Sequence, residues 1–435
     1  MLHMPTATPG VPDRDDDQPT PPPVPATAPI APTWAGHEIL DDPITAGVLL
    51  SVWSGDPAVV VPAPPGSGKS RLVVLLAATL AHRAGLRVGI AAQTRAQAVE
   101  LATRFNSLNY PARLRWGRNT PYPDLGSGPV GIMEGRTGFT GSGGGVSIAT
   151  TARWLLSDPQ HDYCDVLMVD EAWQATYADL GALGALATQL VAVGDPGQID
   201  PVVTGPTNRW ADQPTGPHLP SPTALTAAHG TALSTVALRH TYRLGPDTTA
   251  LIQPVFYPDL PFTSRRPPEH LTLDGNALPE LAHTPVAATN GPTDPALAHA
   301  CASLTRDLLR ANYTTPTGTR PLTGNDLAVV TPHVSQAATI RALLPDHPDI
   351  LIGTANSLQG LERAAVVALH PLAGYRDPTT FGTDLGRACV MLSRHRAHLT
   401  VVTDTATPGI LNTATTTEAQ LHASLLDIIT TTPTR

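Results

Sequence analysis

The chain of 435 residues contains a single lysine, Lys69, within the segment Ala-Pro-Pro-Gly-Ser-Gly-Lys-Ser at positions 63–70. Every other basic residue is arginine, whose planar guanidinium does not fit where a compact ammonium on a flexible stem must reach a phosphate. The apolar run at 58–61 predicts a buried strand before this segment, and the helical spacing of apolar residues from 70 to 84 predicts a helix after it. A strand, a glycine-rich loop and a helix in this order indicate a phosphate-binding loop in an α/β fold.

Each part of such a loop has a chemical task. Backbone N–H groups and the start of the following helix hold phosphate oxygens. The Lys69 ammonium reaches the β- and γ-phosphates, and the Ser70 hydroxyl ligates Mg²⁺. Ala63 departs from the usual pattern, because a glycine is common there. The alternative is a Gly/Pro turn with a chance lysine, which the flanking strand and helix disfavour. The candidate nucleotide-binding residues of the loop are Pro65, Gly66, Ser67, Gly68, Lys69, Ser70 and Arg71.

A second motif follows the loop at a distance of about a hundred residues, where the apolar run 166–169 leads into Asp170-Glu171-Ala-Trp-Gln. An apolar strand that ends in Asp-Glu is typical of the second half of a nucleotide-hydrolysis site. Asp170 would hold Mg²⁺, and Glu171 would orient and deprotonate the attacking water. Taken alone, the motif is equally compatible with a strand that runs into an acidic helix N-terminus. The preceding phosphate-binding loop favours the catalytic interpretation.

The net charge of −9 is unevenly distributed along the chain. Residues 1–42 hold seven acidic residues and one arginine, a net −6, which leaves −3 for the remainder. A basic footprint over the whole protein is absent, so any nucleic-acid contact must be local. The 3 cysteines are far apart, and the 16 histidines show no metal-ligand spacing. No apolar run reaches membrane-spanning length and the acidic start is unlike a signal peptide, so we expect a cytoplasmic protein without membrane contact.

The order of patterns along the chain predicts α/β layers on parallel sheets, because short β-branched runs alternate with helical spacing. Residues 1–36 are expected to be a disordered Pro-rich tail. The stretch 204–231 is rich in Pro, Thr and Gly and is expected to be a loop or linker, and a second loose stretch is expected at 261–295. The strands predicted after the loop are 87–92, 166–169, 190–193, 327–331, 350–354, 364–369 and 399–403.

Further short motifs follow the two described so far. They are Gly-Asp-Pro-Gly-Gln at 194–198, His-Thr-Tyr-Arg at 240–243 with Phe-Tyr at 256–257, Thr-Pro-His-Val-Ser-Gln at 331–336, Ser-Leu-Gln-Gly-Leu-Glu at 357–362 and Ser-Arg-His-Arg at 393–396. Each is a weak signal alone. In this order, over about residues 45–405, they resemble the superfamily 1 helicases. The resemblance is strongest to the branch that contains the nonsense-mediated-decay RNA helicase and its DNA-helicase relatives.

That resemblance implies two RecA-like P-loop NTPase domains with parallel sheets and small accessory insertions, and a site for ATP and Mg²⁺ in the cleft between the domains. The first domain would span 37–235, with a small insertion at about 101–145, and the second would span 236–435. By position, Gln198 would sense the γ-phosphate. Arg243 and Arg394 would act as arginine fingers that stabilise charge in the transition state.

The resemblance also assigns the remaining nucleotide contacts. Tyr242 would pack on the adenine face, although it could also be a core residue, and the two arginines could also form ordinary surface ion pairs. The candidate catalytic residues are therefore Lys69, Asp170, Glu171, Gln198, Arg243 and Arg394. The candidate cofactor-binding residues outside the loop are Tyr242, Gly360 and Glu362, of which Glu362 would contact the ribose, and the candidate metal ligands are Ser70 and Asp170.

The nucleic-acid path has its own candidates. Thr150, Thr354 and Ser357 match positions that line this path in the helicases. The insertion at 101–145 carries a charge of +3 and interleaves aromatic residues with its arginines, as single-strand contact surfaces do. A solvated loop with a small satellite core is an equal alternative. The residues of the insertion expected to contact the strand are Arg113, Arg115, Trp116 and Arg118.

These motifs predict an ATP-dependent motor that acts on single-stranded DNA or RNA as a superfamily 1 helicase. The helicases usually carry a glutamine that reads adenine ahead of the loop, and 41–63 contains none, so base specificity stays open. Two other functions are compatible with the sequence. The reduced accessory regions favour a P-loop ATPase that remodels protein or nucleoprotein without strand unwinding. A nucleotide-dependent binding module without hydrolysis is disfavoured by the complete set of catalytic candidates.

Overall fold

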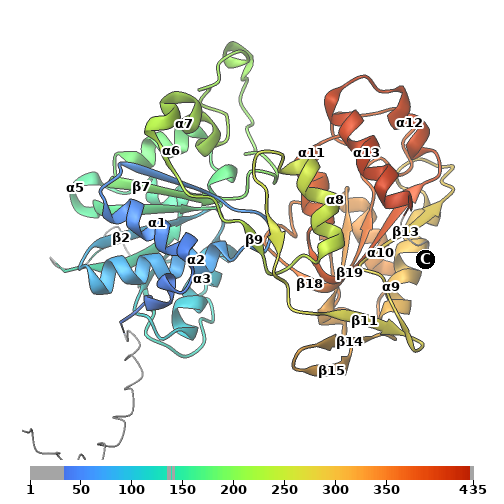
Figure 1. Cartoon of the computed structure of the whole chain (residues 1–435), viewed down its shortest axis with the longest axis horizontal. Helices are drawn as coiled ribbons and strands as arrows, with labels where there is room; N and C mark the ends of the chain where they lie inside the picture. The colour runs from blue at the N-terminus through green and yellow to red at the C-terminus, as the bar shows by residue number, and fades with distance from the viewer. Residues whose placement is uncertain (1–33, 135–138, 140–142, 432–435) are drawn as a thin grey trace, which may run out of the picture. The chain divides into compact units, whose positions relative to one another are not determined.

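The computed structural model describes residues 34–134, 139 and 143–431 (Figure 1). Residues 1–33 of the expected tail and part of the insertion expected at 101–145 therefore lie outside the described residues. Two large parallel sheets dominate the described part, accompanied by two small ones. None of the helices in these ranges is long and apolar enough to cross a membrane.

The first large sheet has the strand order β4-β3-β5-β2-β6-β7-β1-β8, and all neighbouring strands run parallel. Its central strands are continuous apolar runs because both faces of a parallel sheet are covered. Along β1, Val59 and Val61 face one core while Val60 faces the other. The strands are β1 (Ala58–Pro62), β2 (Arg87–Ala92), β3 (Arg113–Trp116), β4 (Gly131–Glu134), β5 (Gly145–Thr150), β6 (Cys164–Asp170), β7 (Ala187–Gly194) and β8 (Ser234–Thr235).

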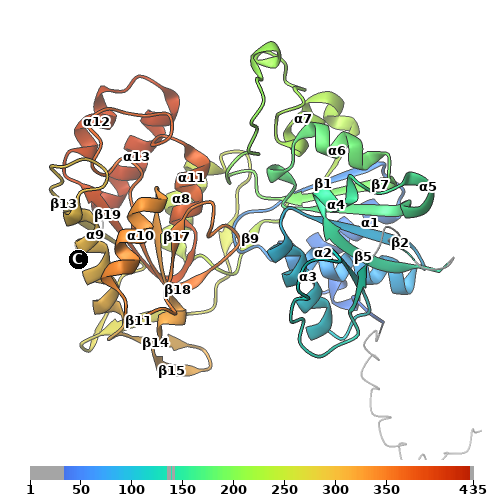
Figure 2. The same ribbon diagram turned by 180° about the vertical axis from the view of Figure 1, so that it is seen from behind.

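Helices cover both faces of this sheet (Figures 1 and 2). α1, α2 and α3 enclose one core, which includes Leu76 and Phe105, while α4, α6 and α7 enclose the other, which includes Trp154 and Leu180. The elements are η1 (His37–Leu40), α1 (Pro43–Trp53), α2 (Lys69–Ala78), η2 (Thr79–Arg83), α3 (Arg95–Ser107), α4 (Thr151–Trp154), α5 (Pro159–Asp162), η3 (Ala172–Gln174), α6 (Tyr177–Gly184), η4 (Asn208–Trp210), α7 (Ser221–His229) and η5 (Gly230–Ala232).

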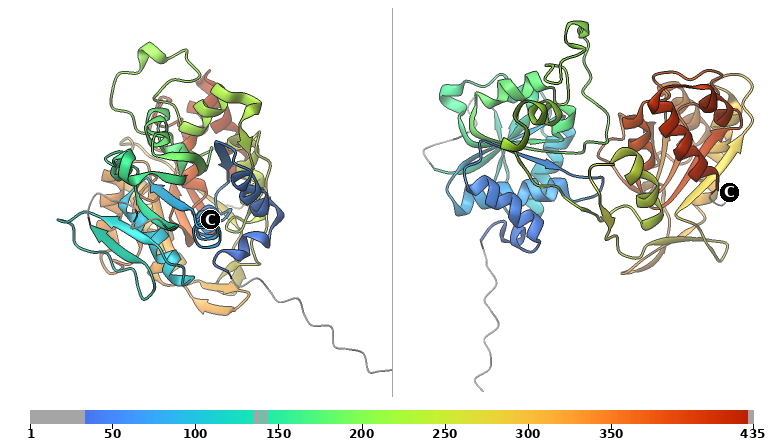
Figure 3. Two further views of the ribbon diagram at one scale, coloured as in Figure 1. Left: turned by 90° about the vertical axis from the view of Figure 1, so that its left-hand side faces the viewer. Right: turned by 45° about the horizontal axis from the view of Figure 1, so that its top comes forward.

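The segment between β7 and α7 runs out from the first sheet, with η4 at its tip (Figures 1 and 3). The loop predicted at 204–231 is therefore correct in its first part and wrong from Ser221 onward, where α7 begins. Pro222 lies in the first turn of that helix, where its missing N–H costs no hydrogen bond. The wrong prediction arose because Pro222 was taken as a sign of a loop.

The second large sheet has the order β13-β19-β18-β16-β17, again with parallel neighbours. α9 and α10 pack on one face around Cys301 and Ile340, and α8, α11 and α13 pack on the other around Ile252 and Leu425. The strands are β13 (Leu281–Val286), β16 (Leu327–Thr331), β17 (Leu351–Thr354), β18 (Arg363–Leu369) and β19 (His395–Asp404). The helices are α8 (Pro246–Phe256), α9 (Pro295–Leu308), η6 (Gly324–Asp326), α10 (Val334–Leu343), α11 (Leu385–Leu392), α12 (Thr407–Thr413) and α13 (Thr417–Thr431).

Two small sheets complete the described part. β9 (His240–Thr241) pairs with β10 (Thr263–Ser264). β11 (His270–Leu273), β12 (Asn276–Ala277), β14 (Asn312–Thr315) and β15 (Gly318–Pro321) form an antiparallel sheet. The loose stretch predicted at 261–295 is therefore wrong, since four strands lie in it. One of them, β13, tolerates Pro285 because it is an edge strand with a neighbour on one side only.

The predicted strands otherwise agree well with the structure. Those at 87–92 and 327–331 have the observed limits. The insertion expected at 101–145 forms no separate subdomain in its described part. Its first residues belong to α3, and β3 and β4 extend the edge of the first sheet.

Candidate nucleotide site and nucleic-acid interface

The phosphate-binding loop follows β1. Residues 241–243, from the second half of the chain, pack directly against this loop. The backbone N–H of Tyr242 donates to the carbonyl of Gly66 at 2.8 Å, and the Thr241 hydroxyl donates to the carbonyl of Pro65 at 2.7 Å. Gly66 has a φ of 71°, and a Cβ there would lie 2.3 Å from Cβ of Arg243. Only glycine permits both the turn and this close approach.

Lys69 is the first residue of α2 and is 8% exposed. Its ammonium lies 3.4 Å from the Ala63 carbonyl oxygen and 3.5 Å from Asp195 Oδ2. Charge-assisted hydrogen bonds to a carboxylate are ordinarily about 2.7–2.9 Å long. The ammonium is therefore held near Asp195 without a tight bond, so that a phosphate could replace the carboxylate.

Asp170 and Glu171 lie at the carboxyl end of β6. Asp170 is 4% exposed, and burial, reinforced by Glu171, raises the pKa of Asp170 to about 7 against the opposing effect of Lys69. Glu171 has a φ of 52°, a left-handed conformation that is uncommon outside glycine. Its backbone N–H donates to Asp170 Oδ1 at 3.1 Å. A buried carboxylate with so little positive charge around it is one that a divalent cation would stabilise.

Charged side chains from the second half of the chain pair with one another beside the loop. Arg243 donates from Nε to Glu362 Oε2 and from Nη1 to the Ser393 carbonyl at 3.2 Å. Arg396 donates to Glu362 Oε1 at 3.1 Å. Burial alone would raise the pKa of Glu362, but Arg243 and Arg396 hold that pKa below its ordinary value. Two candidates for different parts of the nucleotide, Arg243 and Glu362, thus neutralise each other in this structure.

Arg394 is 2% exposed and differs from Arg243 in its partners. Its guanidinium donates to the Val390 carbonyl at 3.1 Å and to Ser393 Oγ at 2.9 Å, and it forms no ion pair with a carboxylate of the described chain. Burial and the nearby Arg243 lower the pKa of Arg394 to about 10, so the group stays charged at neutral pH. A buried cation without an anionic partner is costly, and a bound phosphate would supply the missing anion.

One cavity of about 210 Å³ joins all these groups. Gln198 contributes to its wall, donating from Nε2 to Asp195 Oδ2 at 2.8 Å and accepting from Gln359 Nε2 at 2.9 Å. Of the nucleotide-site candidates only Pro65 does not line it, and its carbonyl is bonded to Thr241. The lining candidates are Gly66, Ser67, Gly68, Lys69, Ser70, Arg71, Asp170, Glu171, Gln198, Tyr242, Arg243, Gly360, Glu362 and Arg394.

A second cavity, of about 560 Å³, adjoins the loop and shares its glycines with the first. Tyr242 lines both cavities and is 43% exposed, so it is not a core residue. Ile44 and Thr45, at the start of α1, also line the second cavity. The position beside the phosphate-binding loop suits a nucleotide base, with Tyr242 as a surface on which the base could stack.

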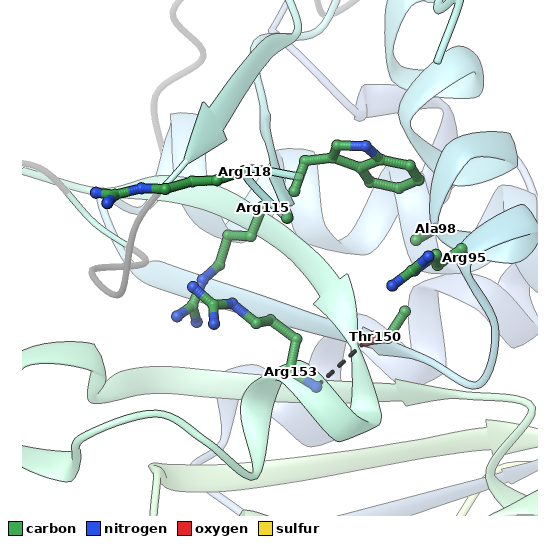
Figure 4. A pocket seen from close by; sticks show the side chains of 8 residues that line it. Arg95, Ala98, Arg115, Arg118, Thr150 and Arg153 are labelled. Atoms are coloured by element: carbon green, nitrogen blue, oxygen red, sulfur yellow. Dashed lines mark hydrogen bonds between the residues drawn. The ribbon is translucent and has the colours of Figure 1, made fainter. Parts of the chain in front are cut away.

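A third cavity, of about 550 Å³, lies beside the carboxyl ends of β3 and β5 and the start of α3 (Figure 4). Thr150, the last residue of β5, accepts a hydrogen bond from the backbone N–H of Arg153 at 3.3 Å. Arg95 and Arg118 line the same cavity, are exposed, and form no ion pair among the described residues. The cavity is therefore positively charged in a protein whose net charge is negative.

Two residues of the insertion that were expected to contact the strand are largely buried. Arg115 is 4% exposed, and its Nη2 lies 3.3 Å from Asp162 Oδ2 in a buried ion pair. Trp116 is 9% exposed, belongs to the first core, and donates its indole N–H to the Pro121 carbonyl at 3.0 Å. Both residues lie in β3, which is packed into the sheet, and they form part of the wall of the third cavity. Arg113 and Arg118, at and beyond the ends of this packed region, are exposed as expected.

Thr354 and Ser357 lie together at the carboxyl end of β17. The Thr354 N–H donates to Ser357 Oγ at 2.9 Å, and this hydroxyl donates to the Thr354 carbonyl at 2.9 Å. Neither residue lines the nucleotide cavity. Their place at the end of a parallel strand of the second sheet corresponds to that of Thr150 in the first.

The sequence alone did not single out several residues in and around the nucleotide cavity, including Gln97, Glu100, Leu101 and Arg104 of α3 in its lining. Asp195 and Gln359 stand inside motifs whose other members were chosen, and Arg396 stands two positions after Arg394. Tyr257 donates to Asp195 Oδ1 at 2.7 Å. The signal that could have identified Asp195 was its place directly after a predicted apolar strand, since the carboxyl ends of parallel strands carry the site.

Two family models match the chain. A model described as an AAA domain matches residues 49–219, and a second one with the same description matches residues 286–406. Each matched segment holds most of one large parallel sheet. The chain therefore contains two AAA-type domains, each built on one large parallel sheet in the manner of a RecA-like fold. No curated protein sequence matches the chain.

Solved structures of viral helicases are among those to which the chain is similar. The arterivirus nonstructural protein 10 helicase has 16% sequence identity and a TM-score of 0.43, covering 81% of this chain and 61% of its own. The PRRSV helicase has 16% identity and a TM-score of 0.41, covering 82% and 54%. The arterivirus protein in complex with DNA has 15% identity and a TM-score of 0.43, covering 81% and 62%. The chain thus spans less than two thirds of the length of these helicases.

Proposed function

We propose that this chain hydrolyses ATP and uses the hydrolysis to move along a single strand of DNA or RNA, as a superfamily 1 helicase. One observation carries the proposal: a single cavity is lined by the phosphate-binding loop, by Asp170 and Glu171, and by Arg243 and Arg394. In this set, the Lys69 ammonium of the loop would bind the phosphates, and the two carboxylates would bind a metal ion and a water molecule. The two arginines would stabilise the negative charge that develops during phosphoryl transfer.

The proposed roles follow from the contacts of each residue. Lys69 would leave its long contact with Asp195 and bind the β- and γ-phosphates instead. Glu171, turned by its left-handed backbone, would accept the proton of the attacking water. Gln198 would contact the γ-phosphate. Arg394, a buried charge that has no carboxylate partner in the described chain, would stabilise the transition state, and Arg243 would join it after leaving Glu362.

The residues present fit Mg²⁺ and a triphosphate. Asp170 is a buried carboxylate whose charge is poorly compensated, and Ser67 Oγ, within the loop, is buried without a hydrogen-bond partner in the described part. The described residues hold no group of three or more His, Cys, Asp and Glu side chains that could bind a metal. Ser70 and Asp170 would hold Mg²⁺ together with the phosphates, and the ion would neutralise charge there.

The single strand would cross the carboxyl ends of the strands in both sheets. On the first sheet, Thr150 and the cavity that holds Arg95 and Arg118 would take backbone phosphates. On the second sheet, Thr354 and Ser357 would contact the strand. Of the residues in the insertion, exposed Arg118 is the proposed phosphate contact, while Arg115 and Trp116 are largely buried in the wall of the same cavity.

Two finer statements belong to the same proposal. The domain limits 37–235 and 236–435 are proposed from the motif order, and the placement of β1–β8 in one large sheet and of β13 and β16–β19 in the other supports them. The nonsense-mediated-decay branch is proposed from the motifs alone.

The proposal is tested by measuring MgATP turnover by the full chain with and without single-stranded DNA and RNA oligonucleotides at low ionic strength. Low salt is chosen because phosphate contacts weaken steeply with salt. Turnover that rises on addition of a strand supports the motor. Turnover without any stimulation favours the ATPase that remodels protein, and absence of turnover removes the proposed function altogether.

A further inference from the structure

The loop that follows β7 connects the first sheet to the core of the second. Ile199 packs in the apolar core formed by α8, α11 and the strands of the second sheet. Gly386, in α11, lies so close that an added Cβ would be 2.7 Å from the carbonyl oxygen of Gln198. The loop 194–199 is therefore continuous with one sheet and anchored in the core of the other.

Tyr257, at the end of α8, makes the most direct contact with this loop. It is 1% exposed, and its hydroxyl donates to Asp195 Oδ1 at 2.7 Å and lies 3.1 Å from Cys389 Sγ. Its ring lies on Gly197, where an added Cβ would be 2.6 Å from the ring, and meets the Phe262 ring edge-on at 5.3 Å. Burial, reinforced by Asp195, raises the pKa of Tyr257 well above its ordinary value. Tyr257 is thus a neutral hydrogen-bond donor.

Asp195 receives hydrogen bonds from three donors and stands beside the only lysine. Tyr257 and the Gly197 N–H donate to Oδ1, at 2.7 and 3.0 Å, and Gln198 Nε2 donates to Oδ2 at 2.8 Å. The Lys69 ammonium is farther away, at 3.5 Å from Oδ2. Each of these hydrogen bonds occupies a lone pair of the carboxylate and so leaves less of its charge for the ammonium. The fewer donors Asp195 has, the more strongly it should hold Lys69.

We propose that Tyr257 is a positioning residue for Lys69 and acts through Asp195. By drawing the Asp195 carboxylate toward α8, its hydroxyl leaves the ammonium loosely held, so that a nucleotide phosphate can take the place of the carboxylate. A residue of the second sheet's core thereby sets how readily the phosphate-binding loop accepts a nucleotide. The inference rests on the proposed function, because it assumes that Lys69 binds phosphate.

The test is Tyr257→Phe, which removes the hydroxyl and keeps the ring on Gly197 and Phe262. We expect KM for ATP, and Kd measured with a fluorescent ATP analogue, to rise about tenfold, the factor that corresponds to 1.4 kcal/mol. Turnover at saturating ATP should stay within about twofold, because Lys69 is fully engaged once ATP is bound. Tyr375→Phe is the matched control, since it removes a hydroxyl bonded to His333 and away from the cavity.

A double-mutant cycle with Asp195→Asn separates this role from a structural one. If Tyr257 acts through the Asp195 charge, Tyr257→Phe has no further effect on KM in the Asp195→Asn background. An unchanged KM in Tyr257→Phe, or effects that multiply in the double variant, overturns the inference. A wild-type chain that binds no ATP analogue removes the proposed function itself, and this result is distinct because it appears before any variant is made.

Discussion

The two sides of the nucleotide cavity are built in different ways. On the first-sheet side, Lys69 and Asp170 stand at the ends of a helix and a strand, and backbone geometry fixes their places. On the second-sheet side, Arg243, Glu362 and Arg396 hold one another through ion pairs between side chains. If a nucleotide binds as proposed, Lys69 on the first side would only have to exchange its contact with Asp195 for one with a phosphate. On the second side, Arg243 must exchange partners before it can contact a nucleotide.

The difference suggests a division of labour. The first side would bind the phosphates and carry out hydrolysis, while the second would respond to the nucleotide by changing its pairing. Arg394 is the exception on the second side, because it is buried and charged without a carboxylate partner in the described chain. It should therefore act without rearrangement.

The largest effect should come from the first side. Lys69→Ala should abolish MgATP turnover, because the sequence holds no other lysine that could substitute for it. The measurement is phosphate release under saturating MgATP, and thermal unfolding without nucleotide serves as the control for folding. Residual turnover near the wild-type rate would mean that the phosphates bind elsewhere.

The second-largest effect on turnover should come from the arginines on the second side of the cavity. Arg394→Ala and Arg243→Ala should each lower kcat by about 10³ or more, the effect ordinarily seen for arginine fingers. Arg320→Ala is the matched control, because Arg320 also pairs with a carboxylate of the second half but lies outside the cavity. Steady-state kinetics give the kcat of each variant and of the control. A kcat of Arg394→Ala equal to that of the control would exclude the guanidinium from the reaction.

Glu171→Gln isolates the water-orienting carboxylate from nucleotide binding. Its kcat should fall by about 10²–10⁴, the range for loss of a general base, while the Kd for a fluorescent ATP analogue stays close to that of the wild type. Single-turnover hydrolysis and equilibrium titration measure the two quantities separately. Comparable turnover in this variant and the wild type would contradict the assignment of Glu171.

The nucleic-acid side of the first sheet should show a smaller effect. Arg95→Ala combined with Arg118→Ala should flatten the slope of log K against log salt by about 1.4, because two phosphate contacts to a single strand are lost. Fluorescence anisotropy of a labelled oligonucleotide at several salt concentrations gives the slope. The control is Arg83→Ala, an exposed arginine that lines none of the three cavities. Equal slopes in the double variant and the control would remove the cavity from the strand path.

The smallest effect concerns a charge pair with no proposed role in the site. The Arg320 guanidinium lowers the pKa of Asp326 to about 2, so the pair stabilises the fold above the ordinary Asp pKa and this stability is lost as pH falls toward 2. Arg320→Ala should lower the free energy of unfolding at pH 7 by less than about 1 kcal/mol, because Arg320 is half exposed. Urea unfolding should show this difference shrinking below pH 4. A difference that grows in acid would contradict the assignment.

Much of the first side could be predicted from sequence because its residues are local patterns. Lys69 and Ser70 follow a strand and begin a helix, and Asp170 ends an apolar run. The pairing on the second side could not be predicted, since Glu362 lies 119 residues after Arg243. Local patterns fix where a backbone turns, while side-chain partners depend on packing over long sequence separations.

The errors in the predicted fold have related causes. Pro222 and Pro285 suggested loops, but one stands in the first turn of a helix and the other in an edge strand, where proline is tolerated. Arg115 and Trp116 had the composition of a nucleic-acid surface. Their strand joined the sheet, so their polar groups found partners inside the protein.

The central claim is that both sides of the cavity act on one nucleotide in the transition state. It is tested by comparing the affinity of wild type and Arg394→Ala for ADP alone and for ADP with aluminium fluoride, which imitates the transferred phosphoryl group. A group that stabilises only the transition state strengthens binding of the analogue and not of the ground state. We predict that Arg394→Ala binds ADP as the wild type does and loses the additional affinity conferred by aluminium fluoride. Equal enhancement in the two proteins would contradict the account.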